Sequence, residues 1–340
     1  MNGKFLLLCS IISSLCCYQQ DTLVFCEVSD VLVDDEPISD APITPISILP
    51  PSNLVGYQVL THSYLTDKTS TMLVQNVKTG TNHIAGTNSI AYTFKSNTTR
   101  YGVYEPDNRK CLDANINSFP LTSIGFMEYR LGTELHCGTG FLIGNGLVVS
   151  AAHCIFNKTA NAFYSSPSIM FGKTNGQSYV ATAQIVEAYI PYQYYSQSSN
   201  DENYDWAILK LSEDNLQETY GALSIGSSYS LSDKEYSSYG YFSSTEYGIN
   251  ASLYVSTAYD VQEESGLVYK TFSYGEGGMS GGPVVGYYSE PDERDPNVEL
   301  SYEMIVGINS MKSHNDDTNL NYIIATKISN ELITLAEVIA

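Results

Sequence analysis

The amino-acid sequence predicts an all-β protein, because many short apolar runs are separated by turn residues and no helical pattern lies between them. Of the 340 residues, 43% are hydrophobic and 28 are tyrosines, whereas tryptophan occurs once. Tyrosine, valine, isoleucine and threonine are residues that favour strands. Charged residues make up 16% of the chain, so the composition allows a substantial core. Together these observations predict a barrel or a sandwich of short strands.

Apolar runs after residue 101 mark the expected strands. The clearest runs are 141–143, 147–149, 205–211, 253–255, 283–285 and 304–308. Residues 56–95 alternate apolar and polar positions, which indicates a small hairpin unit. A helix is expected only at the end of the chain, with Ser329 as its cap and a stripe of apolar residues behind it. That stripe consists of Leu332, Ile333, Leu335, Ala336 and Ile339.

The N-terminal 19 residues have the pattern of a secretory signal peptide, in which Lys4 precedes an apolar run over residues 5–15. The run is too short for a comfortable membrane span, so we expect no membrane anchor, and a retained signal anchor is the alternative. Residues 20–100 follow as a pro-region or linker, acidic and proline-spaced at first. This segment ends in a polar tract at Arg100, the kind of tract in which proteolytic nicking concentrates.

The formal net charge of −21 makes nucleic acid an unsuitable partner, because phosphate binding needs clustered Lys and Arg. Its simplest interpretation is solubility. We expect neither a metal nor another cofactor, since the histidines outside the candidate site show no ligand spacing with Cys or Glu. Entry into the secretory route would permit disulfides and glycosylation. Sequons begin at Asn97, Asn157 and Asn250.

Residues 275–283, of sequence GEGGMSGGP, surround Ser280 with glycines. A serine hydroxyl is a weak nucleophile until a base removes its proton and hydrogen-bond donors stabilise the oxyanion. A glycine-rich turn could supply such donors from the backbone N–H groups of Gly278 and Ser280. Taken alone, the stretch could equally be a hairpin with an incidental serine.

Two further segments contain the groups that a nucleophilic serine needs. His153 follows an apolar strand and lies among small residues, and histidine suits proton transfer near neutral pH. Asp205 begins an apolar strand, where a carboxylate needs a hydrogen-bond donor such as an imidazole N–H. Each residue alone is better explained structurally, as a histidine at a strand end and as a turn or capping aspartate.

The three segments together resemble those of chymotrypsin-fold serine proteases, in the chain order His153, Asp205, Ser280. The motifs that carry the resemblance are Ala-Ala-His-Cys around His153 and Gly-x-Ser-Gly-Gly-Pro around Ser280. Residues 137–144, 203–207 and 105–109 further resemble the secreted glutamyl-endopeptidase (V8-protease-like) branch. The resemblance covers residues 101–340 and implies two six-stranded antiparallel β-barrels, here followed by the C-terminal helix.

The resemblance also implies roles for individual residues. Ser280 would be the nucleophile, His153 the general base and then acid, and Asp205 the group that orients the imidazole. The N–H groups of Gly278 and Ser280 would form the oxyanion hole, and Cys137 would pair with Cys154 in a disulfide.

Substrate-binding positions follow from the same resemblance. They are Tyr274, Gly275, Asn309 and Ser310. The branch has a threonine where this chain has Gly275 and a glutamate-recognising histidine where it has Asn309, so we do not expect a strong preference for glutamate. Met279 stands where trypsin-like enzymes carry the aspartate that pairs with a newly formed α-amino group, so activation by that pairing is not expected.

We therefore expect a secreted serine endopeptidase, or one of a secretory lysosomal or vacuolar compartment, that acts as a monomer on proteins or peptides. An activating protease would cut near Arg100, and Cys26 and Cys111 could tether the pro-region to the catalytic domain. The alternatives are a trypsin-like protease of another branch and a non-catalytic protease homologue that binds a partner through the former cleft.

Overall fold

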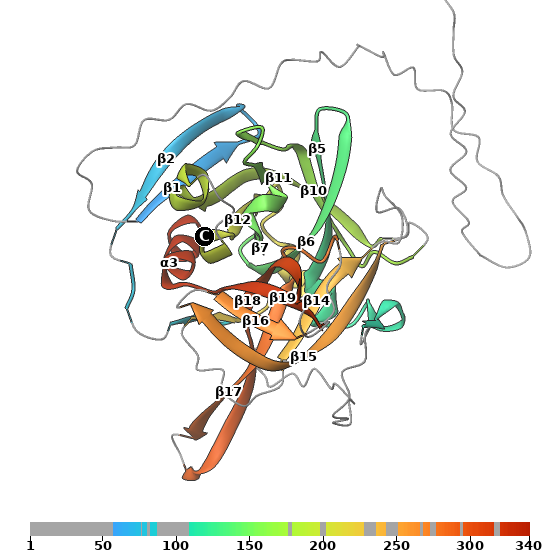
Figure 1. Ribbon diagram of the computed structural model, residues 1–340, viewed down its shortest axis with the longest axis vertical. Coiled ribbons are helices and arrows are strands. Elements are labelled where there is room, and N and C mark those ends of the chain that lie inside the picture. The colour runs from blue at the N-terminus through green and yellow to red at the C-terminus, as the bar shows by residue number, and fades with distance from the viewer. Residues whose placement is uncertain are drawn as a thin grey trace, which may run out of the picture. The chain divides into compact units, whose positions relative to one another are not determined.

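The fold is known from a computed structural model. It describes residues 57–75, 77–79, 82–86, 109–175, 179–197, 202–227, 236–242, 251–265, 268–272, 277–292, 295–315 and 320–340. The predicted signal peptide, the Arg100 cleavage site, Cys26, Tyr274 and Gly275 lie outside these residues. The strands form two large sheets, each of which closes on itself (Figure 1).

The first sheet contains a closed barrel of six antiparallel strands in the order β10-β5-β6-β7-β12-β11, which closes because β10 and β11 also pair. The strands are β5 (Ile124–Leu131), β6 (Glu134–Gly144), β7 (Leu147–Ser150), β10 (Ser165–Phe171), β11 (Ala181–Pro191) and β12 (Ala207–Leu211). β7 is buried at every residue and β12 at all but Lys210, which explains their uninterrupted apolar sequences. A short hairpin of β8 (Phe156–Asn157) and β9 (Ala162–Phe163) lies beyond β7 in the chain.

The second sheet contains a barrel in the order β17-β14-β15-β16-β19-β18, closed by pairing between β17 and β18. Its strands are β14 (Tyr236–Phe242), β15 (Ser252–Ser265), β16 (Val268–Phe272), β17 (Pro283–Asp292), β18 (Asp295–Asn315) and β19 (Leu320–Lys327). Short strands extend this sheet, namely β3 (His83–Ile84), β4 (Lys110–Cys111) and β13 (Ile225–Gly226). The predicted all-β fold of two six-stranded barrels is therefore confirmed.

Helices in the described part of the chain are short. They are α1 (Tyr192–Ser196), α2 (Leu216–Tyr220), α3 (Asn330–Ile339) and four single 3₁₀ turns, Asp113–Asn115, Leu121–Ser123, Ala152–Cys154 and Glu202–Tyr204. The predicted C-terminal helix is confirmed as α3, and the Ser329 hydroxyl caps it by accepting a hydrogen bond from the N–H of Leu332. No helix among these residues is long and apolar enough to cross a membrane.

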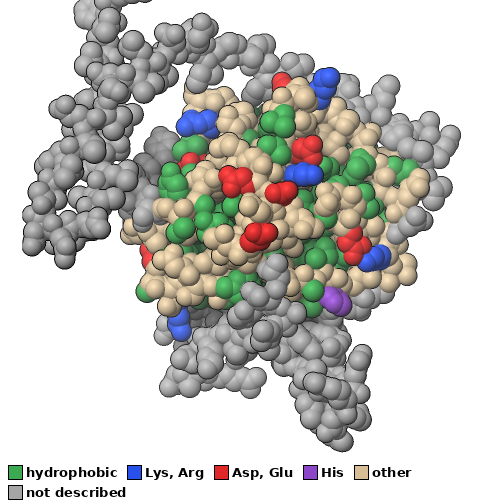
Figure 2. Space-filling view, turned by 180° about the vertical axis from the view of Figure 1, so that it is seen from behind, with side chains coloured by type: hydrophobic (Ala, Val, Ile, Leu, Met, Phe, Trp, Pro, Cys, Tyr) green, Lys and Arg blue, Asp and Glu red, His purple; other side chains and the backbone are tan. Residues whose placement is uncertain are grey.

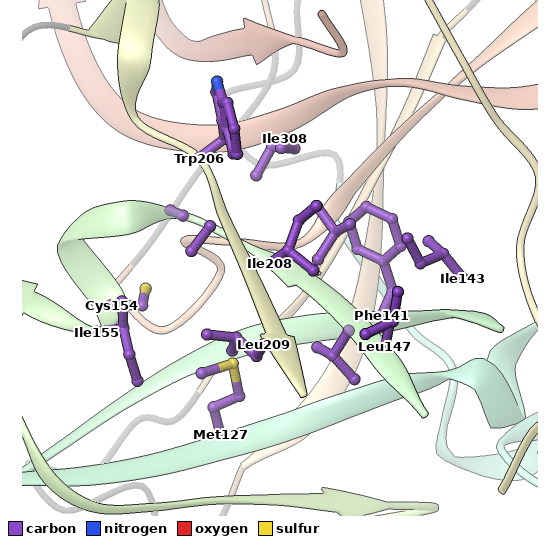
Figure 3. Close-up of a cluster of buried hydrophobic side chains, with 14 of the residues drawn as sticks. Met127, Phe141, Ile143, Leu147, Cys154, Ile155, Trp206, Ile208, Leu209 and Ile308 are labelled. Carbon is purple, nitrogen blue, oxygen red and sulfur yellow. The ribbon is translucent and has the colours of Figure 1, made fainter. Parts of the chain in front are cut away.

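One hydrophobic cluster joins the two barrels. It includes Phe141, Trp206 and Ile208 from the first barrel and Ile308 from the second, all of them 1% exposed or less. Figure 3 shows part of this cluster, in which Ile308 lies among side chains of the first barrel. Because residues of both barrels belong to this cluster, the barrels pack against each other through buried apolar side chains.

Charged side chains of both signs lie on one face of the described chain. Figure 2 shows Asp and Glu side chains spread over one face of the described chain, with Lys and Arg side chains interspersed among them. On this face the basic side chains do not gather into a patch of the kind that phosphate binding uses.

The hairpin predicted within residues 56–95 is present as β1 (Tyr57–Ser63) and β2 (Lys68–Val74). It belongs to the first sheet, because β1 pairs with β11 beside the closed barrel. Further along the chain, β3 pairs with β13 of the second sheet. Strands before and after the predicted domain boundary at residue 101 therefore belong to the same two sheets. Cleavage of the chain at that boundary stays a prediction.

Candidate active site

His153 lies in the 3₁₀ turn Ala152–Cys154, directly after β7. The preceding Ala151 and Ala152 are fully buried, and such small side chains let the turn pack closely against the barrel. The His153 Nδ1 atom lies 2.7 Å from Oδ2 of Asp205, and its backbone N–H donates to Oδ1 of the same carboxylate at 2.9 Å. The His153 side chain remains 34% exposed, so its ring can be reached from outside.

Asp205 precedes β12 and is only 4% exposed. Its carboxylate accepts hydrogen bonds from the His153 backbone, from the His153 ring and from the hydroxyl of Ser310. Burial alone would raise the pKa of Asp205, but the positive charge of His153 and these hydrogen bonds outweigh it and lower the pKa below its ordinary value. Asp205 is therefore ionised at neutral pH.

The same pair governs the pKa of His153. Burial opposes ionisation of the imidazole, but the charge of Asp205 and the hydrogen bond to it prevail, so the pKa is raised well above its ordinary value. A histidine with this partner is a stronger base than a free imidazole and can hold a proton between two transfers.

Ser280 lies in the glycine-rich turn before β17, in the second barrel. Gly278 has φ +97° and Gly281 has φ +83°, values that side-chain-bearing residues rarely adopt. A Cβ atom on Gly281 would also lie 2.1 Å from the carbonyl oxygen of Thr139. Gly278 and Gly281 are therefore required by the conformation of the turn, and Gly281 also by its close approach to the first barrel.

Hydrogen bonds from Thr139 on β6 tie this turn to the first barrel. The Thr139 N–H donates to the carbonyl of Ser280 at 2.8 Å, and its hydroxyl donates to the carbonyl of Gly278 at 2.7 Å. The N–H of Tyr241 donates to the same hydroxyl at 2.8 Å. Thr139 is fully buried, so these bonds are shielded from water and fix the serine turn beside β6, which pairs with the strand before His153, β7.

The Ser280 hydroxyl donates to the carbonyl of Ser310 at 3.5 Å. Among the described residues, it makes no hydrogen bond to the His153 ring. Catalytic hydrogen bonds are often long or misaligned before substrate binds, so this geometry does not remove His153 as the base. Ser310 thus contacts both predicted partners, through its carbonyl to Ser280 and through its hydroxyl to Asp205.

The backbone N–H groups of Gly278 and Ser280, predicted to bind the oxyanion, donate to no acceptor in the described part of the chain. Their neighbours in the turn differ, because the N–H of Gly281 donates to Asn309 at 2.7 Å and that of Gly282 to Met279 at 3.0 Å. Backbone donors left unpaired beside a nucleophile are what an oxyanion hole consists of. The assignment of Gly278 and Ser280 to it stays a prediction.

A small hollow opens beside Ser280, with an accessible volume of about 20 Å³, enough for roughly one water molecule. Its other lining residues are Met279, Asn309, Ser310, Met311, Lys312 and Ile323. We refer to this space as the serine hollow. Of the four predicted substrate-binding residues, it contains Asn309 and Ser310, whereas Tyr274 and Gly275 lie outside the described residues.

The Asn309 side chain makes its hydrogen bonds inside the second barrel. It is 2% exposed, its Oδ1 accepts from the Ser238 hydroxyl at 2.8 Å, and its Nδ2 donates to the carbonyls of Tyr239 at 2.9 Å and Met279 at 3.4 Å. Ser310 likewise directs its hydroxyl to Asp205. The side chains of Asn309 and Ser310 therefore stabilise the site from within, while both residues also line the serine hollow. Their direct contact with substrate stays a prediction.

The predicted disulfide between Cys137 and Cys154 is absent, and both residues are free cysteines. The Cys154 sulfur lies over Gly138, 2.8 Å from where a Cβ atom on that glycine would be, and close to the Ser280 carbonyl, at 3.7 Å. Adjacent residues of a strand point to opposite faces, so Cys137 directs its side chain away from this sulfur. Burial, with nearby negative charge, raises the pKa of Cys137 to about 11, which leaves an unreactive thiol.

Sequence reasoning missed one residue that organises the site, Thr139, and for the predicted site residue Ser310 it missed the hydrogen bond from the hydroxyl to Asp205. A buried carboxylate such as Asp205 needs several donors, and this requirement signals that further polar residues must converge on it. Which residues they are depends on how β6 and β18 approach the two loops. That approach is a property of the folded sheets and has no local pattern in the sequence.

In the family comparison, residues 138–290 match the model described as the trypsin-like peptidase domain. Among solved structures, a Glu endopeptidase in complex with MPD has a TM-score of 0.54 and 19% sequence identity, covering 68% of this chain and 96% of its own. The protease Anisep from Arthrobacter nicotinovorans gives a TM-score of 0.46 and 18% identity, covering 62% of this chain and 92% of its own. No curated protein sequence is a significant match.

Proposed function

We propose that this chain is a serine endopeptidase that cleaves peptide bonds through a triad of His153, Asp205 and Ser280, a proposal supported by its chymotrypsin fold and by the match of residues 138–290 to the trypsin-like peptidase domain. The observation that carries the proposal is the 2.7 Å hydrogen bond between His153 Nδ1 and the buried Asp205 carboxylate. A serine in a rigid glycine turn, held against the first barrel by Thr139, completes the set.

In the proposed reaction, Ser280 Oγ attacks the carbonyl carbon of the scissile bond while His153 Nε2 accepts the hydroxyl proton. Asp205 keeps the Nδ1–H tautomer and stabilises the imidazolium that forms. The N–H groups of Gly278 and Ser280 bind the oxyanion. His153 then protonates the leaving amine, and a water molecule activated by the same imidazole hydrolyses the acyl-enzyme.

We further propose that the residue before the scissile bond has an uncharged side chain. Met279, Met311 and Ile323 contribute apolar atoms to the lining of the serine hollow. The Asn309 amide, which stands where the glutamyl branch carries its histidine, is already fully hydrogen-bonded inside the barrel. A buried carboxylate without charge-assisted donors would be unfavourable, so glutamate is disfavoured in this position.

Labelling with a fluorophosphonate tests the triad, because the probe reacts only with an activated serine. We expect the purified protein to be labelled at Ser280 and the Ser280→Ala variant not to be labelled. Ser227→Ala is a control, since Ser227 is buried with its hydroxyl bonded to Asn82 and Asn330, and labelling should persist. A folded wild-type protein that stays unlabelled would instead support the non-catalytic homologue.

The location of the enzyme and its maturation belong to the same proposal. The signal pattern over residues 1–19 supports export through the secretory route, and the polar tract ending at Arg100 supports a processing cut there. N-terminal sequencing of protein recovered outside the producing cells tests both. Protein found only inside those cells with its N-terminal Met1 intact would contradict export.

A further inference from the structure

Strand β1 continues the first sheet beyond its closed barrel. β11 pairs with β10 along residues 181–184, with β12 along residues 185–189 and with β1 along residues 187–191. β1 is buried on both faces, because the neighbouring Val59 and Leu60 are both fully buried. The hairpin of β1 and β2, residues 57–74, is therefore bonded into the barrel wall, beside α3 in Figure 1.

One end of this hairpin contacts the aspartate segment. The ring of Tyr57 stacks on the ring of Trp206, with centroids 6.0 Å apart and planes inclined by 16°. Trp206 is 1% exposed and is the residue next to Asp205. The Tyr57 hydroxyl is buried without a hydrogen-bond partner in the described part of the chain, so the ring, and not the hydroxyl, makes the useful contact.

The other end contacts the histidine segment. The ring of His62 stacks on Phe163 at 4.6 Å and 11°, and Phe163 packs edge-on against Phe156 at 5.1 Å. Phe156 begins β8, two residues after the 3₁₀ turn that carries His153. Burial lowers the pKa of His62, and Thr69 on β2 bonds its Nδ1 at 2.9 Å, so at neutral pH the ring acts as an uncharged packing group.

From these two contacts we infer that the β1–β2 hairpin is a permanent part of the active enzyme, in which Tyr57 and His62 are positioning residues for the Asp205 and His153 segments. The inference rests on the proposed triad. Fixing two segments from one rigid hairpin holds the general base and its orienting carboxylate in register, and a misplacement of about 1 Å between such groups costs roughly 10²-fold in rate. On this view, residues 57–74 cannot be discarded with a pro-region.

The kinetic test compares Tyr57→Ala with Tyr57→Phe. We expect kcat for a peptide substrate to fall about 10- to 100-fold in Tyr57→Ala, with KM changed less than about twofold. Tyr57→Phe keeps the ring and should restore the wild-type kcat. Phe171→Ala removes a fully buried ring stacked on Tyr220, a contact outside both catalytic segments, and should leave kcat unchanged. A folded Tyr57→Ala with the wild-type kcat would overturn the inference.

A second measurement separates this inference from the triad mechanism itself. In a Ser280→Ala background, the low-field NMR signal of the His153 Nδ1 proton reports the hydrogen bond to Asp205 without any turnover. We expect Tyr57→Ala to weaken or shift this signal and Phe171→Ala to leave it in place. An unchanged signal in Tyr57→Ala would overturn the positioning role of Tyr57. Inactivity of the wild-type protein would be a different result, because it would contradict the proposed function and not the positioning role.

Peptide mapping tests whether the hairpin stays with the enzyme, and it needs no variant. Active protein is captured through a fluorophosphonate on Ser280, washed under native conditions and digested for mass spectrometry. We expect peptides from residues 57–74 in equimolar amount with peptides from the barrels, whether or not the chain has been cut after the hairpin. Fully active enzyme that lacks residues 57–74 would overturn the inference.

Discussion

Replacing Ser310 by alanine removes a single hydrogen bond from the buried carboxylate of Asp205. Hydrogen bonds to charged groups contribute about 1.5–3 kcal/mol each. Asp205 keeps two other donors, the backbone N–H of His153 at 2.9 Å and its Nδ1 at 2.7 Å. We therefore expect the free energy of unfolding to fall by about 1.5 kcal/mol, the lower end of that range. We also expect kcat/KM to fall about tenfold.

The pH dependence of the stability difference between wild type and Ser310→Ala tests whether the Asp205 carboxylate causes that difference. The pKa of Asp205 is lower in the folded protein than in the unfolded chain, so its stabilisation is present above the unfolded value of about 3.9 and is lost as pH falls through the folded pKa. Ser310→Ala raises the folded pKa towards the unfolded value. The difference between wild type and variant should therefore be full at neutral pH and vanish in acid.

Urea unfolding in a Ser280→Ala background, which prevents self-digestion, measures this difference between about pH 7 and pH 3. Ser238→Ala is the matched control, because Ser238 is also buried but donates to the neutral Oδ1 of Asn309 at 2.8 Å. Its cost, about 1 kcal/mol, should not change with pH. A Ser310→Ala effect that is equally independent of pH would refute the reasoning.

Three other predictions concern the reaction and the processing of the chain. Ser280→Ala should lower peptide hydrolysis by several orders of magnitude, to a residual rate about 10³–10⁴ above that in water, and near-normal steady-state hydrolysis by this variant would exclude the serine mechanism. A peptide-library digest should yield cleavages mainly after uncharged residues, and a majority after glutamate would contradict the proposal for the serine hollow. If Cys26 and Cys111 tether the pro-region, a processed pro-fragment should separate on gels only after reduction, and its release without reductant would exclude the tether.

A fourth prediction concerns the coupled titration of the pair. Because Asp205 raises the pKa of His153 above its unfolded value, the stabilisation from a protonated His153 is full below about pH 6.5 and is lost as pH rises through the folded pKa. In Asp205→Asn the NMR titration of His153 should move down towards the ordinary value. A His153 titration that does not change in Asp205→Asn would show that the carboxylate is not its partner.

The barrel strands can be predicted from the sequence because several of them are buried along nearly their whole length and therefore consist of apolar residues. In β7 and β12, apolar and polar residues hardly alternate and nearly all residues are apolar, so their composition alone predicts a place in the core. The His153 and Ser280 segments were also readable, since small residues and glycines are needed wherever a backbone must pack closely or adopt positive φ.

Contacts that depend on which strands lie side by side could not be predicted from local sequence patterns. The β1–β2 hairpin was recognised as a hairpin, but its place against β11 depends on pairing between residues more than 120 positions apart. The disulfide expected from resemblance failed because the strand directs Cys137 away from Cys154. The inward-facing amide of Asn309 follows from the position of Ser238 on another strand, which no local pattern specifies.

Trp206, the single tryptophan of the chain, makes the centre of this enzyme directly observable by fluorescence. The indole is almost completely shielded from water, adjoins Asp205 in the chain and stacks on Tyr57, so we expect its emission to depend on both the Asp205 segment and the hairpin. With no second indole to add background, any event that opens this region shifts the whole tryptophan signal to longer wavelength. Loosening of the hairpin can thus be followed in real time in the unmodified protein, separately from global unfolding followed by far-ultraviolet circular dichroism.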